Sequence, residues 1–229
     1  MTLLDHCMNP RPRSADPYMP TFLEHLANSF THGVPILPVA FGTSLLVEKG
    51  ADLTQKVCAL VFGASLVLLL VSSTVYHVYC IFAWKTGWWH WLKIGDRTSI
   101  YVYIASSYTP WLALVNFPDA LGMRMMFLMW LMALLGSLYS LFFIEQNKAL
   151  ETLLYLIVGF LPAYILLMKH DEVLSGFNEL ALGGLAYAGG VVVFKCDGRI
   201  PFAHALWHIC TLVGSGFHYY AIYTYLMSS

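Results

Sequence analysis

The chain has 229 residues, of which 59% are hydrophobic and only 11% are charged, and its formal net charge is −1. A soluble domain of ordinary composition carries about 25% charged residues. The composition therefore argues against a soluble globular protein, and nothing in the sequence indicates nucleic-acid binding. Long apolar blocks dominate the chain, which is typical of membrane-spanning helices.

The first 20 residues are polar and rich in proline, and they contain no apolar stretch of the kind found in a signal peptide. We expect residues 1–20 to form a disordered cytoplasmic tail without a cleaved signal. Residues 21–229 are expected to form a single transmembrane domain, because the connections between the apolar blocks are too short to hold a second one.

Seven apolar blocks follow the tail, and each is close to the ~20 residues that cross a bilayer as an α-helix. Membrane-spanning β-strands would instead show alternating segments of about ten residues. The sequence thus predicts an all-α, polytopic membrane protein built as a seven-helix bundle. The blocks lie at 26–47, 57–80, 98–116, 123–144, 150–168, 178–194 and 203–227.

The lysines and arginines predict which end of the bundle is cytoplasmic, because short cytoplasmic loops carry an excess of both residues. With seven spans, eight of the twelve fall on the side of the N-terminus and four on the opposite side. We therefore expect a cytoplasmic N-terminus and a C-terminus on the far side. The eight are Arg11, Arg13, Lys85, Lys93, Arg97, Lys148, Lys195 and Arg199; the four are Lys49, Lys56, Arg124 and Lys169.

Polar residues from three predicted spans meet at the cytoplasmic end. Ser73 and His77 lie near the end of the second span, Asp96 lies at the start of the third, and His204 and His208 begin the seventh. A spacing of four residues places both members of a pair on one face of a helix. Ionisable residues within a membrane indicate a functional site, and this set combines three imidazoles, a carboxylate and a hydroxyl.

Three imidazoles suit Zn²⁺ and leave a fourth coordination position open. In this hypothesis the three histidines are the metal ligands, Asp96 acts as general base or orients a water molecule, and Ser73 hydrogen-bonds that water or a developing oxyanion. Plainer explanations stay open. Asp96 follows a glycine and suits the cap of the third helix, whereas each histidine also suits a packing or interfacial position.

Other polar residues are less specific. Glu24, Asn28 and His32 are spaced four apart, which suits either a polar interfacial turn or a layer of residues around the same site. His25 is expected to be an ordinary interfacial residue. His218, deep in the seventh span, is expected to form an interhelical hydrogen bond. Five cysteines without a CxxC pair argue against a disulfide framework.

The spaced polar set resembles that of the progestin and adipoQ receptor family, which includes the adiponectin receptors and bacterial haemolysin III-like proteins. The pattern from Glu24 to His32 looks like the haemolysin III-type branch. The stretches TPWLAL, FKCDGRIPFAHALWH and HYYAI look like the monocyte-to-macrophage differentiation factor branch. The resemblance extends from about Tyr18 to the C-terminus. It implies a seven-helix bundle with Zn²⁺ held near the cytoplasmic face by His77, His204 and His208.

The resemblance leaves two functions open. The first is a signalling or receptor-like protein of endomembranes (Golgi, late endosome or lysosome) whose zinc site hydrolyses a lipid amide as a ceramidase does. Its partners would be membrane lipids, including a ceramide-like ligand. The second is a non-catalytic scaffold or receptor with a structural Zn²⁺, in which Asp96 and Ser73 are replaceable. Loss of turnover with retention of the metal would separate the two.

Overall fold

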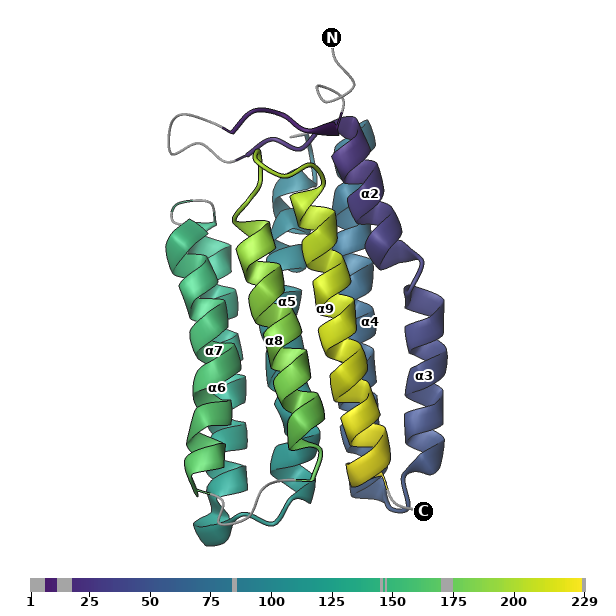
Figure 1. Ribbon diagram of the computed structural model, residues 1–229, viewed down its shortest axis with the longest axis vertical. Helices are drawn as coiled ribbons and strands as arrows, with labels where there is room; N and C mark the ends of the chain where they lie inside the picture. The colour runs from purple at the N-terminus through teal and green to yellow at the C-terminus, as the bar shows by residue number, and fades with distance from the viewer. Residues whose placement is uncertain are drawn as a thin grey trace.

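The structure is a computed structural model that describes residues 7–11, 18–83, 86–144, 146, 148–169 and 175–227 (Figure 1). These residues are mostly α-helical, and none of them lies in a strand. The helices form one elongated bundle, as the all-α prediction requires. They are α2 (Phe22–Gly33), α3 (Ile36–Lys49), α4 (Leu53–Phe82), α5 (Trp89–Leu114), α6 (Leu121–Phe143), α7 (Lys148–Lys169), α8 (Phe177–Phe194) and α9 (Ala203–Ala221).

The first predicted span is broken into α2 and α3. A capping box starts α2: the Thr21 hydroxyl accepts a hydrogen bond from the Glu24 N–H, and the Thr21 N–H donates to the Glu24 carboxylate. The helix ends at Gly33, shortly before Pro35, whose ring nitrogen has no N–H to continue the helical hydrogen bonds. Because of this break, the axis of α2 differs in direction from that of α3, and α2 packs against α4 and α9.

Successive connections alternate between the two ends of the bundle (Figure 1). The α4–α5 and α8–α9 connections lie at the same end as the start of α2, and the α3–α4 and α5–α6 connections lie at the opposite end. The C-terminal end of α4 therefore meets the N-terminal ends of α5 and α9, as the seven-span topology predicts. All five cysteines have free thiols, which agrees with the absence of a disulfide framework.

The exterior of the bundle is apolar. Phe82 is 83% exposed, Leu37 79% and Phe127 71%, and many other large apolar side chains lie on the outer surface with them. An apolar surface of this extent suits contact with lipid and would be unfavourable in water. In the described part of the chain, four segments are long and apolar enough to cross a membrane: Phe22–Lys49, Leu53–Phe82, Pro118–Phe143 and Phe177–Phe194. The chain is a multi-pass membrane protein.

Helices α5 and α6 approach closely at Gly136. A Cβ atom at this position would lie 2.4 Å from the Tyr101 ring, and Tyr101 is fully buried. We expect Gly136→Ala to lower the free energy of unfolding by about 1–3 kcal/mol, because the ring has no space into which it can move. Denaturant-induced unfolding in detergent micelles would measure the change.

Gly189→Ala in α8 is the matched control, since a Cβ atom there would meet nothing within 4 Å. This control should keep or slightly raise the stability, because alanine favours a helix more than glycine does. Equal stability of the two variants would contradict the close α5–α6 contact.

Candidate metal centre

Three histidines converge between α4 and α9. One ligand-type atom from each of His77, His204 and His208 lies within 4.8 Å of the others. The ring centroids are 5.2 Å apart for His77 and His204, 5.6 Å for His77 and His208, and 4.6 Å for His204 and His208. His77 and His208 are each only 2% exposed. The structure therefore brings together the three residues that the sequence predicts as ligands.

Asp96 and Ser73 do not belong to this group. Helix α5 begins at Trp89, well before the start that the apolar block predicts, so Asp96 is inside the helix and does not cap it. The capping alternative is wrong because the tryptophan-rich stretch before Asp96 is itself helical. Ser73 is buried, and its hydroxyl lies within hydrogen-bonding reach of the Asp96 carboxylate.

Helix α2 packs against two of the three histidines, His77 and His208. Asn28 is completely buried, and the His32 ring stacks on the His208 ring with 3.6 Å between centroids and 10° between planes. For Asn28 and His32, the structure thus favours the layer around the site over the interfacial turn. His25 is 3% exposed, and its Nδ1 lies 3.0 Å from Nδ1 of His77, so the interfacial prediction for His25 is wrong.

A helical pattern could have indicated His25. Residues 25, 28, 29 and 32 follow the spacing of one helix face, and all four are buried. The spacing of four that starts at Glu24 also includes residues 28 and 32, but it omits His25. Polar side chains at the start of a membrane span ordinarily suit the interface between membrane and water. In α2 they face the interior of the bundle instead.

Glu24 stabilises the start of α2 through hydrogen bonds. Its carboxylate accepts hydrogen bonds from the Thr21 N–H and from the Tyr18 hydroxyl, the latter at 2.8 Å. Burial, together with this bond to Glu24, raises the pKa of Tyr18, so the phenol stays a neutral donor. Tyr18 in turn accepts from the Asn9 N–H at 3.0 Å. Of the predicted tail, residues 1–6 and 12–17 lie outside the described residues.

His218 does not form the expected interhelical hydrogen bond with any described residue. Both of its ring nitrogens are buried without a hydrogen-bond partner, and the ring lies against Gly183 and edge-on to Tyr187. The interhelical bond nearby is made instead by Tyr103, whose hydroxyl donates to Ser215 at 2.8 Å. Packing against the glycine, which lacks a side chain, accounts for the position of the imidazole.

The donor set and its surroundings fit a metal ion. Neutral imidazole is a preferred ligand of Zn²⁺, and Nε2 of His77 is buried without a hydrogen-bond partner in the described part of the chain. The same holds for the Asn28 side-chain amide and both His32 ring nitrogens. Buried polar atoms without partners are costly, so this cluster suits a metal ion, water or a polar substrate group.

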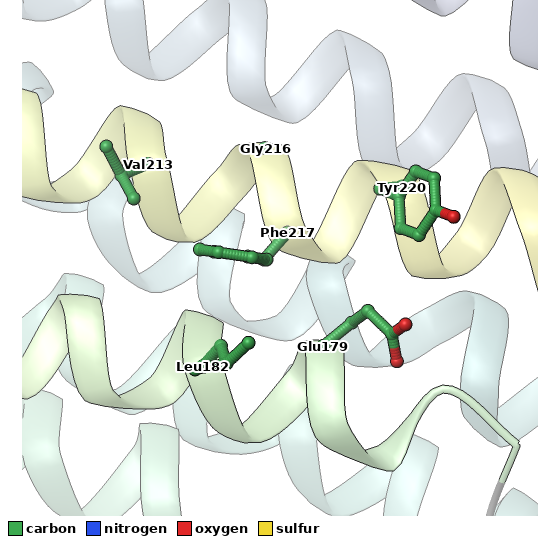
Figure 2. Close-up of a pocket in the computed structure, with 6 residues that line it drawn as sticks. All are labelled: Glu179, Leu182, Val213, Gly216, Phe217 and Tyr220. Carbon is green, nitrogen blue, oxygen red and sulfur yellow. The ribbon is translucent and has the colours of Figure 1, made fainter.

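The structure also has a shallow groove of about 440 Å³ on the outer faces of α8 and α9 (Figure 2). Leu182 and Phe217 face the space between the two helices, with Glu179 and Tyr220 toward one end. None of the predicted site residues lines it, so the groove and the histidine cluster are separate features.

The sequence comparisons agree with these observations. The family model described as "Haemolysin-III related" matches residues 21–219. "Monocyte to macrophage differentiation factor" of Homo sapiens is 40% identical over 226 residues, which cover 97% of this chain and 92% of that protein. "Hemolysin-3 homolog" of Bacillus subtilis is 34% identical over 214 residues, covering 90% and 95%. "Hemolysin-3" of Bacillus cereus is 31% identical over 219 residues, covering 89% and 92%. With its helical bundle and histidine cluster, the chain belongs to the haemolysin-III related family of membrane proteins.

Proposed function

We propose that the chain is a membrane-embedded, Zn²⁺-dependent hydrolase of a lipid amide such as a ceramide. The observation that supports this proposal most is the division of the polar residues into two sets. Three imidazoles converge, and the carboxylate of Asp96 and the hydroxyl of Ser73 form a second set that does not belong to the group. Three ligands with an open position are typical of catalytic zinc sites, whereas structural sites use four protein ligands.

A bound Zn²⁺ ion supplies Lewis-acid chemistry: it polarises the amide carbonyl and makes a nearby water molecule more acidic. The side chains of the protein would supply the proton transfer and the hydrogen bonding. Asp96 takes a proton as general base, and the buried Ser73 hydroxyl donates a hydrogen bond to the oxyanion that develops from the carbonyl. The apolar exterior of the bundle would let the hydrocarbon chains of a lipid substrate stay within the bilayer.

A second candidate is a signalling or receptor-like protein with a structural Zn²⁺. The burial of His77 and His208 supports it, because a metal held there would join α4 to α9 and stabilise the bundle. The printed name of the human relative also suits a role in cell differentiation. Residence in the Golgi, late endosomes or lysosomes belongs to either version of the proposal, and microscopy of the tagged chain would test it.

The decisive experiment compares Asp96→Asn with the wild type in lipid nanodiscs. Zinc content and turnover of a fluorescent short-chain ceramide are measured on the same samples. We expect Asp96→Asn to retain the metal and to lose turnover by about 100-fold or more, because it removes the base and leaves all three imidazoles in place.

Asp119→Asn is the matched control, since Asp119 lies in the α5–α6 connection at the opposite end of the bundle. It should keep full turnover. A zinc-loaded wild type that turns over no lipid amide, with Asp96→Asn behaving like the control, would contradict the hydrolase and leave the structural zinc as the better explanation.

A further inference from the structure

Helix α2 contacts two of the three candidate ligands through hydrogen bonds at the ring nitrogen Nδ1. The Thr31 hydroxyl lies 3.0 Å from Nδ1 of His208, and Nδ1 of His25 lies 3.0 Å from Nδ1 of His77. A histidine that binds a metal through one ring nitrogen commonly donates a hydrogen bond from the other, which sets its tautomer and ring orientation. Both contacts have the distance that such a bond requires.

The contact with Thr31 has a defined direction. A threonine hydroxyl carries a single proton. The hydroxyl oxygen lies 3.0 Å from Ala27 O and 3.1 Å from Asn28 O, two carbonyl oxygens of α2 itself. When the proton is donated to one of these carbonyls, the oxygen accepts from Nδ1 of His208. The ring then carries its proton on Nδ1 and its lone pair on Nε2.

The contact between His25 and His77 has a favoured direction for a different reason. Nε2 of His77 is buried and has no hydrogen-bond partner among the residues that the structure describes. A metal ion bound at this nitrogen takes up its lone pair, and the single proton of the neutral ring is then on Nδ1. In that state Nδ1 of His77 donates to Nδ1 of His25.

We propose that α2 is the helix that orients the metal ligands, with Thr31 as the positioning residue of His208 and His25 as that of His77. Neither residue belongs to the three-histidine group, and neither contacts the metal in this arrangement. Each holds one imidazole as the Nδ1–H tautomer, with Nε2 directed at the ion. The inference rests on the proposed metal site, to which it adds the residues that orient two of its ligands.

Thr31→Val tests the first contact, because it removes the hydroxyl and keeps the shape of the side chain. Thr74→Val in α4 is the matched control: among the described residues, its hydroxyl bonds to the Leu70 carbonyl of its own helix alone, at 2.7 Å. Both variants lose a bond to the helix backbone, and only Thr31→Val loses a bond to a ligand. We expect Thr31→Val to bind Zn²⁺ about 10- to 100-fold more weakly than the control in a chelator competition.

His25→Leu and His25→Gln test the second contact. Leucine removes the acceptor for His77 and should weaken zinc binding by a similar factor of about 10 to 100. Glutamine offers an amide oxygen as acceptor and should restore much of the affinity. Nitrogen-15 NMR of histidine-labelled, zinc-loaded protein gives an independent measurement: the Nδ1–H of His77 should show the shift of a hydrogen-bonded donor in the wild type and lose it in His25→Leu.

The outcomes distinguish this inference from the metal site itself. Wild-type protein that binds one Zn²⁺, together with a Thr31→Val variant as tight as Thr74→Val, would overturn the role of α2 and leave the site intact. Wild-type protein without any zinc affinity would overturn both. Should His25→Leu fail to fold, Thr31→Val and His25→Gln still decide the question.

Discussion

Replacing His208 by alanine is expected to abolish stoichiometric zinc binding and to remove the stabilisation that zinc provides. His208 is buried, lies within ligand distance of His77 and His204, and is one of only three imidazoles in the group. A ligand at 1,000 times its Kd stabilises a protein by about 4 kcal/mol, and His208→Ala should lose that amount. Metal analysis after gel filtration and unfolding with and without zinc would measure both effects.

His218→Leu is the matched control for His208→Ala, because it removes an imidazole from the same helix. His218 lies ten residues further along α9, about 15 Å at the helical rise. It should keep its zinc, and its stability should be unchanged or slightly higher, since the two unsatisfied ring nitrogens disappear. Equal loss of zinc from both variants would mean that the metal is not held by the cluster.

The second large effect is expected at the ion pair between α5 and α7. The Arg97 guanidinium donates to the Glu151 carboxylate at 2.8 Å, and the two side chains are 14% and 6% exposed. The Tyr155 hydroxyl donates to the other carboxylate oxygen at 3.1 Å. Arg97→Met should lower the free energy of unfolding by about 3–5 kcal/mol, because Glu151 is left buried without its counter-charge. Unfolding in mixed micelles, followed by tryptophan fluorescence, would measure it.

The double variant Arg97→Met/Glu151→Leu is the control for this prediction. Replacing both charges with apolar side chains of similar size should restore most of the stability, since an apolar pair needs no desolvation of charge. If the single variant were as stable as the wild type, the pair would be accessible to water and would not hold α7 to α5.

The ion pair also bears on the candidate metal centre, because Arg97 directly follows Asp96 in α5. A loosened contact with α7 would let this part of α5 shift relative to α4. Asp96 would then move with respect to Ser73, although the three histidines belong to α4 and α9. We therefore expect α7 to help hold Asp96 in position and to have no such effect on the three histidines.

Local sequence determined much of this protein. The length of the apolar blocks predicts membrane-spanning helices, of which the first is broken into α2 and α3. The spacing of four residues places Ser73 with His77 and His204 with His208 on single helix faces. Alternation of the spans then brings the end of α4 to the starts of α5 and α9. The three-histidine cluster could be predicted because each step depends only on chain length and helical geometry.

The tertiary structure decided which residues surround that cluster. The inward rotation of α2 buries His25 and places Thr31 on His208, a result of how α2 packs on α4 and α9. The start of α5 at Trp89 moves Asp96 from a cap into a helix. These features depend on the rotation and contact of helices that are distant in the chain. Helical periodicity fixes the relative positions of residues within one helix, but only packing against other helices selects the face that turns inward.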